Sequence, residues 1–308
     1  MTDYRGLLDE VAVPRLAGTG PAERVREVLK RELAARGFVA MEHRFTGRSL
    51  LHRLARVPLS GVNLIGVRPR ARVVTWLVAH YDSKGQPLSM AARLVAAGLT
   101  GVGAVELLGL ALRALLGTIP PGPLDGVIGG AGGAGAALLA LNRVTDRSAG
   151  AVDNAAGVVT ALATVDALPP ESPVGVIFPD AEEYGLLGAR ALVRERANLL
   201  AGTSIVNFDG IDDRGTTIAL MHRAGATVDR VARALEARRA RWLPVLVDGL
   251  ALAATARECV TIMRGDWRTA RVVHTPRDVP ARLTLDGAGR VAGAVAAALS
   301  VDARRPGV

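Results

Sequence analysis

Residues 73–83 read VVTWLVAHYDS, a short apolar run that ends in polar residues. The run has the length of a buried strand, and two further runs, VGVIF (174–178) and SIVNF (204–208), end in the same way. The polar residues at or just beyond the three ends are His80, Asp82, Glu182, Glu183 and Asp209. Because ligands gather at the carboxyl ends of parallel strands, we expect these side chains to converge in one crevice.

Strands alternate with helices along most of the chain. Further apolar runs of strand length lie at 61–67 and 217–220, and the predicted helices lie at 21–36, 154–167, 185–200 and 284–300. This alternation predicts the α/β class, with a mixed, mostly parallel central sheet that carries helices on both faces. We expect residues 1–308 to form a single domain that is interrupted by one insertion.

Residues 88–142 break the alternation, because they are almost continuously small and apolar. Residues 94–112 carry one charge, that of Glu106, and residues 126–141 carry none. A spanning helix needs roughly 20 apolar residues, so we expect a hydrophobic helical hairpin that enters a membrane. A soluble hairpin that caps the site or forms an oligomer interface is the alternative. The glycine pairs Gly126/Gly130 and Gly129/Gly133 have the spacing that lets membrane helices pack closely.

The charges beside the insertion predict its orientation. Its flanks carry Lys84, Arg93, Arg143 and Arg147, whereas the connecting turn carries little beyond Arg113. The positive-inside rule then places the main domain in the cytoplasm. The first residues, MTDYRGLLDEVAVPRL, lack the apolar segment of a secretory signal. We therefore expect a membrane-associated protein with a cytoplasmic main domain, and a soluble cytoplasmic protein is the alternative.

The composition narrows the choice of partners. The net charge is +9, but only two of the 38 basic residues are lysines, and the arginines are scattered among four Phe and three Tyr. A nucleic-acid surface more often groups basic residues with stacking aromatics, so we expect no nucleic-acid partner. The charge also suits an anionic membrane surface. The single cysteine, Cys259, excludes a disulfide framework and a Cys-rich zinc site.

Two histidines and several carboxylates make up the predicted site. Asp153 opens the helix after the insertion, and His274 follows a short apolar run near the carboxyl end. Nitrogen and oxygen donors of this kind suit zinc, with manganese and cobalt as alternatives. A carboxylate such as Asp153 can bridge two ions, which together activate a water and polarise a carbonyl. Glu182 and Glu183 can divide metal binding and proton transfer between them.

Five motifs, in this order, resemble peptidase family M28, the zinc aminopeptidases. They are HYDS (80–83), VDNAAG (152–157), DAEEYGLLGA (180–189), NFDGI (207–211) and HTPRD (274–278). The resemblance covers most of residues 14–87 and 148–300. It implies a zinc-exopeptidase-like fold, a single metallopeptidase domain, a peptide substrate and two Zn²⁺ per chain.

The resemblance also implies a role for each matching residue. The implied metal ligands are His80, Asp153, Glu183, Asp209 and His274. His80 and Asp209 would bind one zinc, Glu183 and His274 the other, and Asp153 would bridge both.

Two further residues are implied in catalysis. Glu182 would be the general base that takes a proton from the bridging water and passes it to the leaving amine. Asp82 would accept a hydrogen bond from the second ring nitrogen of His80 and so fix its tautomer. The remaining histidines, His43, His52 and His222, lie outside any motif and are not expected to bind metal.

The chain departs from the family pattern in two places. The stretch between Asp82 and Asp153 is unusually long, because it holds the apolar insertion. No tyrosine near His274 is available to steady an oxyanion, and Arg268 is the residue in that region that could bind a substrate carboxylate or developing negative charge.

The leading interpretation is a dinuclear zinc exopeptidase, specifically an aminopeptidase. A glutaminyl-cyclase-like enzyme is one alternative, and that branch of the family resembles a one-zinc site. A catalytically inactive scaffold or receptor on the same fold is the other alternative. The oligomeric state and the residue specificity stay open.

Overall fold

The computed structural model describes residues 2–48, 58–117 and 120–303. Within them one eight-stranded sheet has the order β1-β2-β4-β3-β5-β8-β6-β7. The strands are β1 (Val39–Gly47), β2 (Leu59–Val67), β3 (Thr75–Val78), β4 (Val174–Phe178), β5 (Ser204–Ile211), β6 (Thr216–Arg223), β7 (Arg238–Ala240) and β8 (Glu258–Gly265). The pairs β3–β4, β3–β5, β5–β8 and β6–β7 are parallel, and the other three are antiparallel. The predicted mixed, mostly parallel sheet is confirmed.

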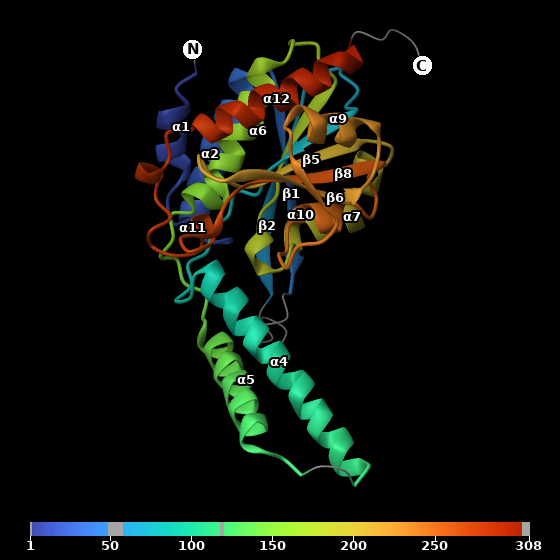
Figure 1. Cartoon of the computed structure of the whole chain (residues 1–308). Coiled ribbons are helices and arrows are strands. Elements are labelled where there is room, and N and C mark those ends of the chain that lie inside the picture. Colours follow the sequence, from blue (N-terminus) through green and yellow to red (C-terminus); the bar gives the residue numbers. More distant parts are fainter. Residues whose placement is uncertain (1, 49–57, 118–119, 304–308) are drawn as a thin grey trace.

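Helices cover both faces of the sheet (Figure 1). One face carries α1 (Tyr4–Val11), α2 (Gly20–Ala35), α6 (Ala156–Ala167), α9 (Ala226–Ala234) and α12 (Asp286–Ala303). The other carries α7 (Leu187–Glu195), α8 (Ala197–Leu200) and α10 (Asp248–Leu252). Strand β3 shows why two cores form: Leu77 packs on the first face, and Trp76 and Val78 pack on the second.

The sequence patterns located some elements better than others. The five apolar runs of strand length correspond to β2, β3, β4, β5 and β6. Strands β1, β7 and β8 and helices α1, α9 and α10 were not predicted, although β8 contains the largely apolar run CVTIM (259–263). The helix expected at 185–200 is two helices, α7 and α8, which are separated at Arg196, where the backbone leaves helical geometry.

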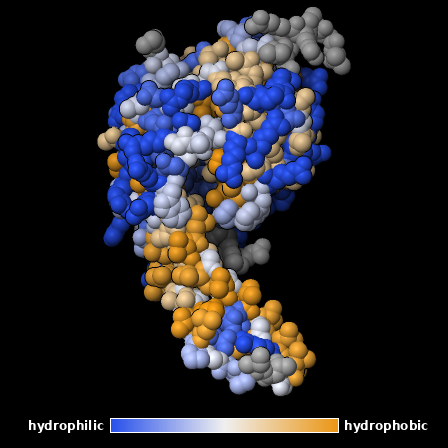
Figure 2. Space-filling model, in the orientation of Figure 1, coloured by the Kyte–Doolittle hydropathy of each residue, from blue (hydrophilic) through white to orange (hydrophobic). Residues whose placement is uncertain are grey.

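The apolar insertion is a helical hairpin, as predicted. Helices α4 (Met90–Leu115) and α5 (Pro123–Leu141) project from the body of the protein (Figure 1), and most of their surface is hydrophobic (Figure 2). Both are long and apolar enough to cross a membrane. The hairpin begins and ends at neighbouring points, because the Leu88 amide donates to Asn142 Oδ1 at 2.9 Å.

The contact between the two helices differs from the expectation. Gly103 faces Gly132, and a Cβ on either residue would lie 2.6 Å from the other residue's Cα, so only glycine allows this approach. In contrast, no atom lies within 4 Å of a Cβ built on Gly126, Gly129, Gly130 or Gly133. The four predicted glycines therefore do not pack against α4. Because α5 is apolar on all sides, its sequence does not reveal which face is turned inward.

A buried arginine ties the amino-terminal segment to the loops around the sheet edge. The Arg15 side chain is fully buried and donates to the backbone oxygens of Val13, Tyr81, Ala149 and Gly150. Burial lowers its pKa to about 10, against the raising effect of nearby carboxylates that include Asp82. One side chain thus holds together the segments that lead to His80 and Asp153.

We expect Arg15→Met to lower the free energy of unfolding by roughly 3–5 kcal/mol, because it leaves several buried carbonyls unpaired and removes a compensating buried charge. Urea unfolding followed by tryptophan fluorescence measures the change. The matched control is Arg24→Met on the exposed side of α2, which should stay within about 0.5 kcal/mol of the wild type. An Arg15→Met variant as stable as this control would contradict the assignment.

Candidate metal centre

The ends of three neighbouring strands supply most of the site. His80 and Asp82 follow β3, Glu182 and Glu183 lie in the 3₁₀ turn Glu182–Tyr184 after β4, and Asp209 lies in β5. Since β3 pairs in parallel with both β4 and β5, the three carboxyl ends meet at one edge of the sheet. The structure therefore brings all five side chains to one place.

Asp153 and His274 reach the same edge from outside the sheet. Asp153 lies in the turn Ala151–Ala155 that precedes α6, where its backbone is not helical, and His274 lies in the loop after α11 (Trp267–Ala270). Asp278 holds this turn in place, because its carboxylate accepts from the amides of Val152 and Asp153 at 2.8 and 3.3 Å.

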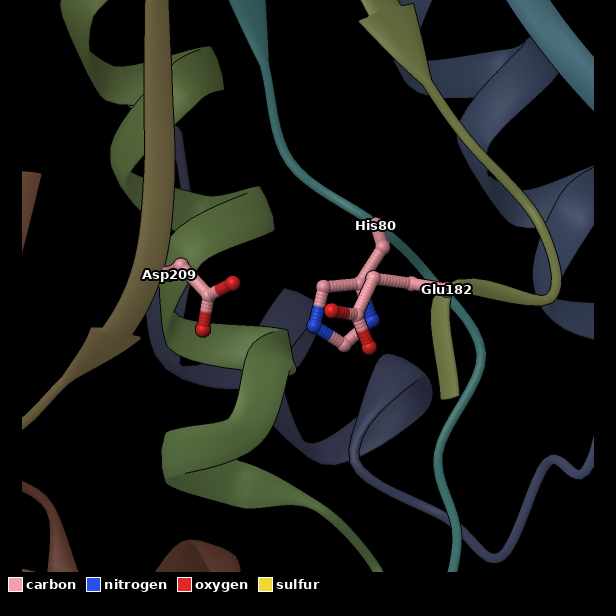
Figure 3. Close-up of side chains that lie close together, drawn as sticks. All are labelled: His80, Glu182 and Asp209. Atoms are coloured by element: carbon pink, nitrogen blue, oxygen red, sulfur yellow. The ribbon is translucent and has the colours of Figure 1, made fainter. Parts of the chain in front are cut away.

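The site consists of two adjoining groups of possible ligands. His80, Glu182 and Asp209 form one group (Figure 3), and Asp153, Glu183 and His274 form the other, with the ligand atoms of each group within 4.8 Å of one another. Asp153 joins the groups: its Oδ1 lies 3.1 Å from His80 Nε2, and its Oδ2 lies 2.9 Å from His274 Nε2. His274 Nε2 is also 2.9 Å from Glu183 Oε1.

The donor atoms fit divalent metal ions. His80 Nε2, His274 Nε2, Glu183 Oε1 and Asp209 Oδ2 are buried, and none of them has a partner with good hydrogen-bond geometry among the described residues; the close contacts of the first three are to one another and to Asp153. Two donors on one tetrahedral zinc lie about 3.3 Å apart, which is close to the spacings here. Asp153 turns one oxygen toward each histidine, so it lies between the two groups, and each group could hold a metal ion.

Negative charge accumulates around Glu182. Burial raises the pKa of Glu182 well above its usual range, and the charges of Glu183 and Asp209 add to the rise, while His80 opposes it. Burial likewise raises the pKa of Asp209 to about 8. These carboxyl groups cannot all ionise together unless positive charge is added, which is what a metal site supplies.

The two carboxyl groups of the second group, those of Asp153 and Glu183, are ionised at neutral pH. Burial opposes the shift, but the charges of His274 and Lys84 lower the pKa of Glu183 to about 2. The Lys84 Nζ lies 2.7 Å from Glu183 Oε2. Burial also works against the ionisation of Asp153, yet His274 and His80 hold its pKa well below the usual range.

Asp82 is fully buried and has more partners than expected. Its carboxylate accepts from the backbone amides of Glu182 and Glu183 at 3.1 and 3.2 Å. His80 Nδ1 lies 3.2 Å from the backbone oxygen of Asp82 and 3.4 Å from the carboxylate Oδ1. The Asp82 carboxylate therefore links the loop after β3 to the loop after β4, whereas the hydrogen bond of His80 Nδ1 is to the backbone oxygen of Asp82 and not to the expected carboxylate.

Asp248 is a site residue that sequence reasoning missed. It begins α10, is fully buried, and neither carboxylate oxygen has a hydrogen-bond partner among the described residues. Burial raises its pKa to about 7, and its charge in turn raises the pKa of Glu182 and Asp209. It belongs to none of the five motifs, so only packing places it beside them.

A pocket of about 430 Å³ opens onto Asp153, Glu182, Glu183, Asp209 and His274. Its walls are largely apolar and come from distant segments, among them Met90 and Leu94 of α4, Ile218 of β6, Leu246, Met263 and Val273.

Two arginines line the pocket, Arg264 from β8 and Arg93 from the hairpin. Arg93 of α4 lines the pocket, and its guanidinium contacts His274 Nδ1. Arg268, which the sequence suggested for this position, is exposed and does not line the pocket. The expectation for Arg268 is therefore wrong, because α11 turns that side chain away from the site.

The remaining histidines serve other contacts. His43 Nε2 lies 3.0 Å from Glu195, and His222 Nε2 lies 2.8 Å from Thr261 Oγ1. Burial lowers the pKa of His222 to about 4. His52 lies outside the described residues.

Comparison with solved structures shows related folds. A zinc aminopeptidase from Bacillus subtilis superposes with a TM-score of 0.63 at 12% identity, covering 97% of this chain and 94% of that chain. A glutaminyl cyclase from Porphyromonas gingivalis superposes with a TM-score of 0.63 at 15% identity, covering 97% of this chain and 97% of that chain. A glutaminyl cyclase from Fimbriiglobus ruber superposes with a TM-score of 0.60 at 18% identity, covering 97% of this chain and 92% of that chain.

At these identities the likeness establishes the fold alone. No curated protein matches the sequence. The sequence model of peptidase family M28, in contrast, matches residues 63–299, which is well over half of the chain. The chain therefore belongs to peptidase family M28 and has the family's hydrolase fold.

Proposed function

We propose that the chain is a dinuclear zinc-dependent aminopeptidase that removes amino-terminal residues from peptides. One observation carries the proposal: the two oxygens of Asp153 face His80 on one side and His274 on the other. The match to a peptidase family and the structural similarity to zinc aminopeptidases support this proposal.

Five side chains would hold the metal. His80 and Asp209 would bind one ion, Glu183 and His274 the other, and Asp153 both. Two zinc ions would lower the pKa of a bound water and polarise the carbonyl of the scissile bond. Asp82 and Asp278 fix the ligand loops through backbone hydrogen bonds, which keeps the ligands oriented before substrate arrives.

Glu182 would be the general base. It lines the pocket next to the ligands, and its raised pKa suits a carboxyl that accepts a proton and returns it to the leaving amine. The apolar pocket walls favour substrates with an apolar first side chain. Arg93 would place a positive charge beside the carbonyl oxygen, where negative charge develops.

A glutaminyl-cyclase-like activity is the second candidate, and Asp248 favours it. Glu182, Asp209 and Asp248 are three buried acids; burial raises the pKa of each, the charges of Asp209 and Asp248 add to the rise for Glu182, and that of Asp248 adds to the rise for Asp209. Such a group can share protons instead of binding metal. Only Asp153, Glu183 and His274 would then hold an ion. Glutaminyl cyclases are among the structural neighbours.

We further propose that the hairpin inserts into a membrane with the body on the cytoplasmic side. Its two helices are exposed and hydrophobic over most of their length (Figure 2). The charged groups near its tip are paired: Arg113 Nη2 lies 2.7 Å from both Glu106 Oε1 and Asp125 Oδ1. Paired charges lower the cost of placing polar groups at membrane depth.

We expect Glu182→Gln to keep the metal and to lower kcat by a factor on the order of 10²–10⁴, the usual contribution of a general base. Metal content and hydrolysis of peptides with an apolar first residue are measured on the same preparation. Glu195→Gln on the surface is the matched control and should leave both unchanged. Full activity in Glu182→Gln would remove Glu182 from the mechanism.

Metal content distinguishes the two enzyme candidates. Elemental mass spectrometry should find two zinc ions per wild-type chain, and Asp209→Asn should lose one of them because that group then lacks a ligand. In a cyclase-like site the wild type would hold one ion, and Asp209→Asn would not change it. Asp229→Asn on α9 is the control. No metal after zinc is supplied would support the inactive scaffold.

Replacing residues 90–141 by a short Gly-Ser linker should release the protein from membranes. The ends to be joined are neighbours, so the body should still fold, which circular dichroism checks. Full-length protein should stay in the pellet after alkaline carbonate extraction, and the variant should move to the supernatant. Full-length protein that is soluble without detergent would rule out insertion.

A further inference from the structure

A groove lies where the hairpin meets the body, on the opposite side of α4 from the metal centre pocket. Its volume is about 600 Å³. The hairpin supplies an apolar wall that includes Val95, Leu99 and Leu138. The body supplies the other wall with Trp267, Arg271 and Arg277. The groove is thus apolar along the hairpin and cationic where it reaches the body.

The end of the groove at the body carries two exposed arginines and no acidic residue. Arg271 and Arg277 are exposed, and neither forms an ion pair with a carboxylate among the described residues. The Arg277 guanidinium donates to the backbone oxygen of Arg271 at 3.4 Å, which brings the two residues side by side. No acidic residue lines the groove. Two guanidinium groups that line the same end of one groove suit a phosphate, which a guanidinium can bind in a bidentate manner.

The apolar end of the groove continues into the hairpin surface. Val95, Leu99 and Leu138 remain exposed although they are large and hydrophobic. Trp267 is 55% exposed at the junction, and tryptophan is enriched at the level of lipid headgroups in membrane proteins. A ligand that fills both ends needs a phosphate and a hydrocarbon chain on the same molecule.

We propose that this groove binds an anionic phospholipid. Arg271 and Arg277 hold its phosphate, Trp267 lies at the headgroup, and an acyl chain runs along Val95, Leu99 and Leu138. The proposal rests on membrane insertion of the hairpin, which supplies the lipid. A free phosphate would leave the apolar wall uncovered, and a second copy of the hairpin would leave the two arginines without an anion.

The position of the groove brings the lipid close to the metal centre. Met90, Arg93 and Leu94 of the first turns of α4 line the substrate pocket, whereas Ala92 and Val95 line the groove. The same two turns of helix therefore separate lipid from substrate. A lipid in the groove supports the wall that carries Arg93.

Native mass spectrometry of the full chain in a non-ionic detergent tests the proposal. The protein is stripped of lipid and then given dioleoylphosphatidylglycerol or dioleoylphosphatidylcholine. We expect about tenfold preference for phosphatidylglycerol, because only the anionic lipid gains unopposed charge-assisted contacts. The double variant Arg271→Gln/Arg277→Gln should lose this preference. The matched control Arg233→Gln/Arg238→Gln removes two exposed arginines on α9 and β7 and should keep it.

Competition separates a lipid site from a simple anion site. Inorganic phosphate and glycerol phosphate carry the charge without the acyl chain and should not displace phosphatidylglycerol. Displacement by either one would overturn the proposal, as would equal binding of the two lipids or unchanged binding by the Arg271→Gln/Arg277→Gln variant. A hairpin-mediated dimer that excludes lipid would also overturn it.

The lipid-binding assay does not depend on membrane insertion of the hairpin, so the two proposals are tested separately. It is carried out in detergent and needs no inserted hairpin, whereas carbonate extraction tests insertion alone. If the protein stays in the membrane pellet after carbonate extraction but shows no preference between the two lipids, the lipid site in the groove is contradicted and membrane insertion is not. A protein that is soluble without detergent would overturn insertion first.

Discussion

The structure depends on how it accommodates many carboxylates that are buried at one edge of the sheet. An isolated buried carboxylate costs several kcal/mol, so each one needs a compensating partner. Backbone amides compensate Asp82 and Asp278, and Lys84 compensates Glu183. The buried charge of Arg15 acts on several of them at once. The charge of His80 lowers the pKa of Glu182, Asp209 and Asp248, but no lysine or arginine pairs with these three acids among the described residues, and that imbalance suits the site to metal.

Backbone hydrogen bonds and charge have separate tasks in this arrangement. Asp82 connects the loops after β3 and β4, and Asp278 holds the turn that presents Asp153, so both carboxylates fix the course of the backbone. The possible metal ligands then face one another within two adjoining groups. A site of this kind is organised before any ion or substrate enters, which is the condition for strong electrostatic stabilisation of a transition state.

Sequence patterns predict the part of the site that follows from local structure. His80 and Glu182 stand directly after buried strands, so their place at the sheet edge follows from the strand pattern alone. Asp248 and Arg93 carry no such signal, because a separate loop and the inserted hairpin bring them to the site through long-range packing. The hairpin itself follows from composition, but the face of α5 that contacts α4 does not. Uniformly apolar helices give no periodic signal of their inner side.

The place of the hairpin in the chain determines the order in which the protein can be completed during synthesis. Strand β3 precedes the hairpin, but its two neighbours in the sheet, β4 and β5, follow it. The ribosome therefore releases the whole apolar arm before the central strands can pair, at a rate of about 5–20 residues per second. The arm can reach a bilayer while the body is still unfolded. The residues of the candidate metal centre can come together only after β4 and β5 have been made, so under the proposed insertion the centre would form beside the bilayer.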